Sequence, residues 1–133
     1  FLSGMRHADI TAISHRYGLP DAKLLPTWTR TFTFVRNVCA HHGRLWNRPM
    51  VDQPAFPRAG TLIDFDHVSA SRPSQERLYG TLVILNFLVR QLNGGTEWHL
   101  RVKELLESFP DSPLLSLTSA GFPAGWEQEA IWN

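Results

Sequence analysis

Histidine, arginine and asparagine are concentrated in one stretch of the sequence, residues 34–48. This stretch contains two histidines, three arginines and two asparagines, and it contains no acidic residue. Within it, Arg36 and Asn37 precede His41 with the spacing R-N-x-x-x-H. These side chains donate hydrogen bonds to anions or exchange protons near neutral pH. The stretch is therefore the first candidate for a functional site.

This combination of groups suits the metal-free cleavage of RNA. The imidazole of His41 can accept the proton of a ribose 2′-hydroxyl or return a proton to the departing 5′-oxygen. The guanidinium of Arg36 can stabilise negative charge that develops on the reacting phosphate. The amide of Asn37, one helical turn before His41, can orient the imidazole or the phosphate. Because each chain supplies one such imidazole, acid–base catalysis by two histidines requires a homodimer with a composite site.

The other residues of the stretch also have structural interpretations. Arg44 and Arg48 are either phosphate contacts or ordinary surface charges. His42 falls on the apolar side of a helical wheel, which favours a hydrogen-bonded core histidine over a catalyst. Trp46 is expected to pack rather than to stack on a base, and Cys39 is expected in the core rather than as a nucleophile. By spacing alone, an Arg–His pair on a helix is more often structural or solvated than catalytic.

A helix over about residues 28–42 is predicted to carry this stretch, and Thr27 is its expected N-cap. One side of the helix is apolar and the other is polar: the apolar side carries Trp28, Phe32, Val35 and Cys39, and the polar side carries Arg36, Asn37 and His41. An ordinary solvated side would mix Glu and Lys, whereas this one contains neither. Gly43 and Pro49 mark the end of the helical pattern. The sequence therefore predicts an amphipathic helix that exposes an anion-binding side.

The rest of the chain predicts an all-α helical bundle that forms a single domain over residues 1–133. Further helices are expected over residues 6–17, 74–93, 97–108 and 126–132, with Ser74 and Thr96 as the N-caps of the second and third of these. Residues 49–72 are expected to form a long loop, because prolines punctuate them. The isolated histidines His7, His15, His67 and His99 are expected at the surface or in loops.

Composition narrows the possible functions. With 133 residues, of which 43% are apolar, the chain can bury a core of its own. Its net charge is +1, so any contact with nucleic acid must come from a local patch. A single cysteine excludes an internal disulfide and is typical of a reducing cytoplasm. No apolar run is long enough to span a membrane.

No metal or other cofactor is expected at the histidine pair. The side chains of His41 and His42 diverge on a helix, and no nearby Asp, Glu or Cys completes a ligand set with usual spacing. The chain begins at Phe1, and its first methionine is Met5. We therefore expect that a region upstream of Phe1 is missing.

The stretch from Arg36 to Arg48, R-N-x-C-A-H-H-x-R-L-W-N-R, closely resembles the signature of the abortive-infection (Abi-like) family of bacterial phage-resistance proteins. That family belongs to the HEPN superfamily of helical nucleases. Three other parts of the chain resemble further segments of the family: residues 10–19, residues 77–88, and Gly121-Phe122-Pro123 with Trp126 and Trp132. The resemblance thus extends over nearly the whole chain.

The resemblance implies an all-α HEPN fold, dimerisation about the motif helix and metal-independent endoribonuclease activity. It implies that Arg36 and His41 are the catalytic pair and that Asn37 is the polar residue beside the arginine. The extended signature is matched by further residues that could support RNA binding: His42, Arg44, Asn47 and Arg48. Family members carry a sizeable N-terminal region, so this chain is expected to be the C-terminal portion of a longer one. They act as toxins or phage-defence effectors, sometimes restrained by an antitoxin protein or an inhibitory RNA.

Three functional hypotheses follow from these observations. The first is a homodimeric, cytoplasmic endoribonuclease that leaves a 2′,3′-cyclic phosphate. The second is a non-catalytic HEPN module that binds RNA or a protein through Arg36, Arg44 and Arg48. The third is a dimerisation domain whose polar side only satisfies buried groups at an interface.

Overall fold

The protein is all-α, as the sequence predicts. The computed structural model describes residues 2–133, and these form six α-helices and five short 3-10 helices without a strand. The α-helices are α1 (His7–Arg16), α2 (Leu24–Ala40), α3 (Asp66–Ser69), α4 (Arg72–Glu76), α5 (Leu78–Leu92) and α6 (Trp98–Glu107). The 3-10 helices are η1 (Leu2–Gly4), η2 (Ile63–Phe65), η3 (Leu117–Ala120), η4 (Trp126–Gln128) and η5 (Ala130–Trp132).

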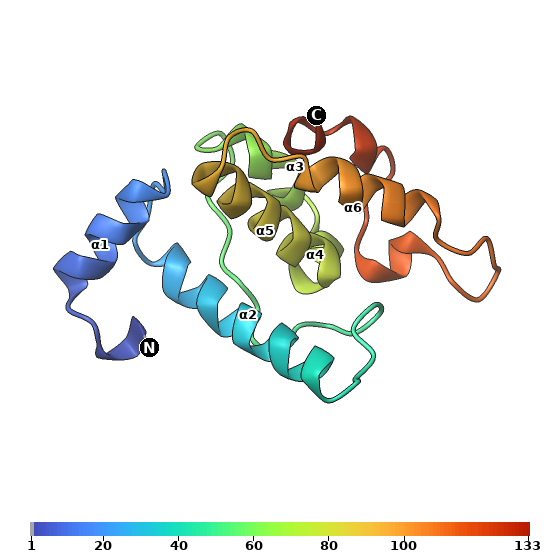
Figure 1. Cartoon of the computed structure of the whole chain (residues 1–133), viewed down its shortest axis with the longest axis horizontal. Helices are drawn as coiled ribbons and strands as arrows, with labels where there is room; N and C mark the ends of the chain where they lie inside the picture. The colour runs from blue at the N-terminus through green and yellow to red at the C-terminus, as the bar shows by residue number, and fades with distance from the viewer. Residues whose placement is uncertain (1) are drawn as a thin grey trace.

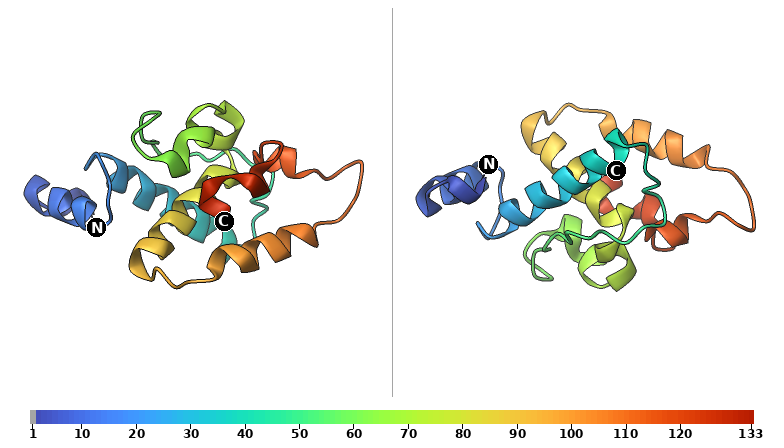
Figure 2. Two further views of the ribbon diagram at one scale, coloured as in Figure 1. Left: turned by 90° about the horizontal axis from the view of Figure 1, so that it is seen from above. Right: turned by 90° about the horizontal axis from the view of Figure 1, so that it is seen from below.

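Helix α5 is the centre of the bundle. It contacts α2, α4, α6, η2 and η5, and seven of its 15 residues are buried. Helix α2 runs beside it, and α6 lies on another side (Figure 1). Helix α1 forms one end of the molecule, and the loop after α6 forms the other (Figure 2). The C-terminal half of α2, which carries the candidate residues, therefore lies at the periphery of the bundle rather than inside it.

An aromatic cluster fixes α2 against α5. The ring of Trp28 lies 5.7 Å from the ring of Phe65 and 6.2 Å from the ring of Phe87, measured between centroids. Trp28 is fully buried, and its indole N–H donates a hydrogen bond to the carbonyl of Ala55 at 2.7 Å. Burial of aromatic side chains of this size is a major source of stability. This contact sets the position of α2, and with it the position of the candidate site.

The predicted limits of α2 are partly wrong. The helix begins at Leu24, so Thr27 lies inside it, and the Thr27 hydroxyl donates to the carbonyl of Leu24 at 2.7 Å instead of capping the helix. Pro26 is tolerated because the first turn of a helix has no internal partner for the missing N–H. The helix ends at Ala40, two residues before the predicted limit.

The predicted helix over residues 74–93 is two helices, α4 and α5. The backbone is extended at Arg77, with φ −123° and ψ −174°, and this breaks the helix. Ser71, not Ser74, is the N-cap of α4, because the Ser71 hydroxyl accepts the N–H of Ser74 at 3.4 Å. Ser74 is buried, and its hydroxyl donates to the carbonyl of Gly121 at 2.7 Å. A long-range contact that the local pattern does not encode therefore decides its role.

Other predicted elements are confirmed or corrected as follows. Helices α1 and α6 are confirmed. The prediction that Thr96 is the N-cap of α6 is wrong, because Glu97 holds that position, although the hydroxyl of Thr96, one residue earlier, accepts the N–H of Trp98 at 3.2 Å. The predicted loop over residues 49–72 contains η2 and α3 and reaches the start of α4, and the predicted helix over residues 126–132 is replaced by η4 and η5. Within the part of the chain that the structure describes, no helix has the length and apolar character needed to cross a membrane.

The interpretation of His67 as a surface or loop residue is wrong. Helix α3 contacts α4 and η2, and His67 Nε2 on α3 lies 2.7 Å from the hydroxyl of Tyr79 on α5. The other ring nitrogen, Nδ1, lies 3.6 Å from a carboxylate oxygen of Glu129, and about 10% of the His67 side chain is exposed. The Tyr79 hydroxyl also accepts the indole N–H of Trp132 at 3.1 Å. His67 thus joins α3 and α5 to the C-terminal segment.

Candidate functional site

The C-terminal end of α2 is closed by a Schellman motif. The N–H of Gly43 donates to the carbonyl of Val38 at 2.7 Å, and the N–H of His42 donates to the carbonyl of Cys39 at 3.1 Å. His42 occupies the left-handed position of this motif with φ 53°, and it is the only non-glycine residue with positive φ among residues 2–133. Glycine usually takes that position, because it has no Cβ to clash there.

This backbone turn determines where the two histidines lie. His41 is the C-cap residue of α2, and its N–H donates to the carbonyl of Asn37 at 3.1 Å, so the two residues remain one turn apart. The turn removes His42 from the helical pattern, and its side chain is exposed. The prediction of a core position for His42 is therefore wrong, because it assumed that the helix continued through this residue.

The polar side of α2 is open to solvent, as predicted. Arg36, Asn37 and His41 are all exposed. The prediction that Cys39 lies in the core is wrong, because this cysteine is exposed. Of the residues predicted on the apolar side of α2, Trp28 is buried, and the buried side also includes Thr31 and Val38. Thr31 can be buried because its hydroxyl donates to the carbonyl of Asp52 at 2.6 Å.

The loop after α2 is held in place at two points. The ring of Trp46 lies 4.9 Å from the ring of Phe109, so the prediction that this tryptophan packs is confirmed. Further along, Met50 is 2% exposed, and its N–H donates to the carbonyl of Glu76 at 2.7 Å. Between these anchors lie Asn47 and Arg48, both exposed. The segment that carries Asn47 and Arg48 is thus attached to the body of the protein on both sides.

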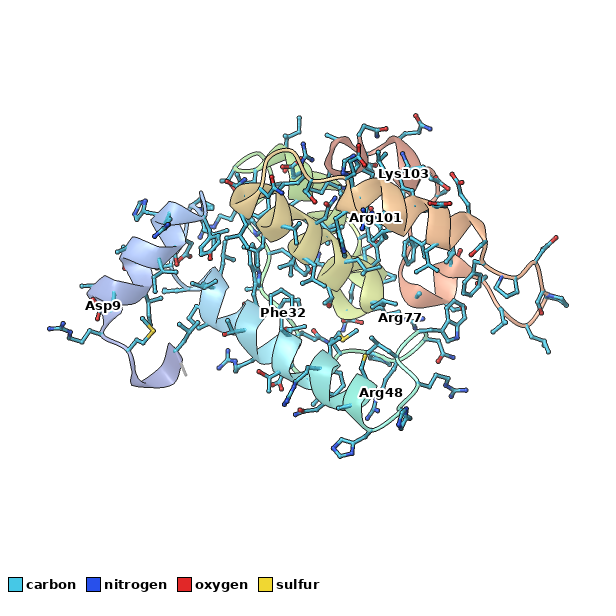
Figure 3. The ribbon with its side chains drawn as sticks, in the orientation of Figure 1. Asp9, Phe32, Arg48, Arg77, Arg101 and Lys103 are labelled. Carbon is cyan, nitrogen blue, oxygen red and sulfur yellow. The ribbon has the colours of Figure 1, made fainter. Side chains whose placement is uncertain are left out.

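Arg48 returns to α2 although it lies beyond the end of that helix. Its guanidinium carbon is 5.5 Å from the centroid of the Phe34 ring, within cation–π range. Figure 3 shows Arg48 beside the C-terminal turns of α2. A pocket of about 440 Å³ lies next to this contact, lined by Arg44, Asn47, Arg48 and Pro49. Four residues were expected to support RNA binding. The structure places Arg44, Asn47 and Arg48 around this one pocket, whereas His42 does not line it.

The electrostatic character of this region is cationic despite the small net charge of the chain. Residues 22–51 contain five lysines and arginines and no aspartate or glutamate. In the part of the chain that the structure describes, the ion pairs are Arg6–Asp9, His67–Glu129 and Arg72–Glu76, all outside this segment. Arg36, Arg44 and Arg48 therefore make no ion pair with a described acidic side chain. Such a surface attracts phosphate groups.

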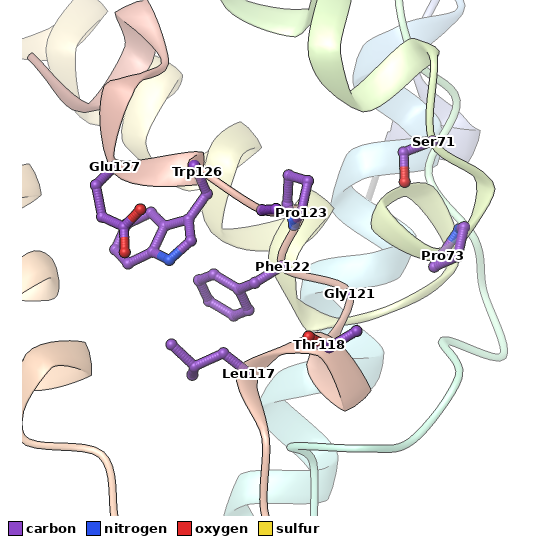
Figure 4. Close-up of a pocket in the computed structure, with 11 residues that line it drawn as sticks. Ser71, Pro73, Leu117, Thr118, Gly121, Phe122, Pro123, Trp126 and Glu127 are labelled. Carbon is purple, nitrogen blue, oxygen red and sulfur yellow. The ribbon is translucent and has the colours of Figure 1, made fainter. Parts of the chain in front are cut away.

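The other hollows are less suited to an anion. One of about 400 Å³ lies at the turn around Gly121, between the rings of Phe122 and Trp126 and the start of α4, and its only ionisable side chain is Glu127 (Figure 4). Another of about 500 Å³, between the N-terminal helices and α2, is lined by four apolar residues and two threonines together with Arg30 and Asp52, whose charges are opposite.

Within residues 2–133, no three His, Cys, Asp or Glu side chains lie close enough together to hold a metal ion.

Comparison with known proteins finds a similarity to a protein family. Comparisons with curated proteins and with solved structures found no significant similarity. Residues 1–47 match the model of a family described as Abi-like protein. This stretch contains α1, all of α2 and the motif as far as Asn47, and it ends one residue before Arg48. The chain is thus similar to the Abi-like family over 47 of its 133 residues, and these include Arg36, Asn37 and His41.

Proposed function

We propose that this protein is a metal-independent endoribonuclease of an abortive-infection, phage-defence or toxin-type system. The observation that carries the proposal is the exposed, acid-free surface of Arg36, Asn37 and His41 at the end of α2. The match of this segment to the Abi-like family supports the biological context. Proton-exchanging and anion-stabilising groups are what RNA transesterification needs from a protein.

In the proposed reaction, the neutral imidazole of His41 removes the proton from a ribose 2′-hydroxyl. The 2′-oxygen forms a bond to phosphorus, and the bond between phosphorus and the 5′-oxygen breaks. A protonated imidazole donates a proton to that 5′-oxygen, so the products are a 2′,3′-cyclic phosphate and a 5′-hydroxyl. Arg36 stabilises the charge on the non-bridging oxygens, and Asn37 orients the imidazole or the phosphate.

A second copy of the chain supplies the second imidazole in this mechanism. Each chain has one His41, and it lies on an exposed helix end, where another copy can approach it. With one His41 neutral and the other protonated, a phosphate between them meets both a base and an acid. The proposed enzyme is therefore a homodimer with a composite site.

The test is cleavage of labelled single-stranded RNA in the presence of EDTA. The wild type should release fragments that end in a 2′,3′-cyclic phosphate, and His41→Ala should be slower by about 100-fold or more. His15→Ala is the matched control, because His15 is an exposed histidine on α1 and should not affect the rate. Equal cleavage by wild type and His41→Ala, or none by either, would contradict the proposal.

The same variants distinguish the two alternatives. A non-catalytic RNA-binding module should bind RNA equally well as wild type and as His41→Ala, with strong salt dependence and no cleaved product. A dimerisation domain should become monomeric or unfold when Arg36 is replaced by Ala. The toxin context is tested separately, because induction of the wild type in bacterial cells should arrest growth and induction of His41→Ala should not.

A further inference from the structure

Phe34 is an aromatic residue on the otherwise polar side of α2. It lies seven residues before His41, which is about two helical turns, so the two residues share one side of the helix. The guanidinium of Arg48 covers its ring at 5.5 Å. This contact brings a charge from the loop onto the side of α2 that carries Asn37 and His41. Along the helix axis, the displacement from Phe34 to His41 is about 10 Å, at about 1.5 Å per residue.

The pocket beside Arg48 is lined mainly by cationic and amide side chains. Two guanidinium groups and one amide line it together with Pro49, and its volume is about 440 Å³. No described acidic side chain forms an ion pair with Arg44 or Arg48. Guanidinium groups bind phosphate through paired N–H donors. A ring beneath the guanidinium restricts its orientation, so less freedom is lost when a phosphate binds.

We infer that this pocket binds a phosphodiester that flanks the scissile one in single-stranded RNA, and that Phe34 positions Arg48 for this contact. The inference rests on the proposed ribonuclease function. The displacement of about 10 Å along α2 favours a neighbouring phosphate over the one between the two His41 side chains. Arg48 is then a binding residue outside the reacting centre, and Phe34 is a positioning residue that does not itself touch RNA.

The test measures binding of short RNAs that cannot be cleaved. The probe is a dinucleotide with a 2′-O-methyl group at the scissile position, either without a terminal phosphate or with one at its 5′ or its 3′ end. In the wild type, the added phosphate at one end should tighten binding about tenfold, as expected for hydrogen bonds to a charged group. The end that gives this gain identifies the direction of the RNA strand across the site.

Variants then assign the gain to individual side chains. Arg48→Gln should abolish it. Phe34→Leu should reduce it about two- to fivefold, and Phe34→Tyr, which keeps the ring, should preserve it. Arg101→Gln is the matched control, because Arg101 is an exposed arginine on α6 (Figure 3) and should leave the gain unchanged. Thermal unfolding of each variant checks that the fold is intact.

The outcomes separate this inference from the proposed function. No gain at either end, or a gain that persists in Arg48→Gln, would overturn the inference even if RNA cleavage still depended on His41. An equal gain in Phe34→Leu and the wild type would overturn the positioning role of Phe34. An Arg48-dependent gain in a protein that cleaves no RNA would refute the proposed catalysis and leave the phosphate contact established.

Discussion

Two helices of this protein end in the same backbone motif but place different residues at its left-handed position. At the end of α1, Gly18 has φ 69° and donates to the carbonyl of His15 at 2.9 Å, and Leu19 donates to the carbonyl of Ser14 at 3.0 Å. At the end of α2, His42 takes the equivalent place with φ 53°. A side chain in that conformation costs about 1–2 kcal/mol, and such residues are concentrated at functional sites.

Substitution of each of these residues by the other type should change the free energy of unfolding in opposite directions. His42→Gly should stabilise the protein by about 0.5–1 kcal/mol, because relief of the left-handed backbone exceeds the extra chain entropy of glycine in the unfolded state. Gly18→His should destabilise it by a similar amount. Urea unfolding of both variants measures the free energies. A loss of stability in His42→Gly would instead show that the histidine side chain makes a stabilising contact.

The residue types of the candidate site could be predicted from the sequence, but their arrangement could not. The acid-free composition of residues 34–48 indicates an anion-binding surface without any structure. The contact between Arg48 and Phe34 depends on how the chain reverses after α2, and the periodic pattern ends at that point. The sequence feature that could have identified Phe34 is an aromatic residue on an otherwise polar side of a helix, and this feature is a weak signal.

At the scale of elements, the local sequence pattern predicted the presence of helices more accurately than it predicted their first and last residues. The apolar periodicity identifies α1, α2 and α6, because it reflects the burial of one side of each helix. It does not identify α3 or the break at Arg77, because these depend on contacts with distant parts of the chain. Arg77 illustrates such contacts, since its guanidinium donates a hydrogen bond to the carbonyl of Ser119 at 2.6 Å, 42 residues along the chain.

The contact between His67 on α3 and Tyr79 on α5 should make stability depend on pH. Burial lowers the pKa of the His67 imidazole, while the carboxylates of Glu129, Asp64 and Asp66 act in the opposite direction. Burial likewise raises the pKa of the Tyr79 hydroxyl, which keeps this neighbour of His67 neutral. The folded protein therefore holds His67 neutral at pH values where the unfolded chain already binds a proton.

The sign of the effect on stability follows from proton linkage. The unfolded chain binds more protons than the folded one as pH falls below about 6.5, so the contribution of His67 is complete above that pH and is lost as pH falls through the folded-state pKa. We expect the difference in unfolding free energy between wild type and His67→Gln to shrink between pH 7 and pH 5. Urea unfolding at several pH values measures it. A difference that is independent of pH would contradict this role for His67.

At the scale of the whole molecule, the small net charge conceals two oppositely charged parts of the chain. Residues 1–58 contain eight lysines and arginines and three acidic residues, a net charge of +5, and residues 59–133 contain five and nine, a net charge of −4, which together give the +1 of the chain. Helix α2 and its loop belong to the first part, whereas α6 and the C-terminal segment belong to the second. A polyanion such as RNA would therefore be attracted to the first part rather than to the molecule as a whole.

RNA binding should accordingly depend on salt more steeply than the net charge indicates. If Arg36, Arg44 and Arg48 each contact one phosphate, the logarithm of the association constant should fall with the logarithm of salt concentration with a slope of about −2 per chain, at about −0.7 for each contact with a single strand. Fluorescence anisotropy with a 2′-O-methyl RNA between 50 and 300 mM NaCl measures this slope. Arg44→Gln should reduce its magnitude by about 0.7, whereas Arg101→Gln, which removes the same charge from α6, should leave it unchanged. Equal effects of the two substitutions would mean that RNA responds to the total charge, and the anion-binding surface at the end of α2 would then have no special role.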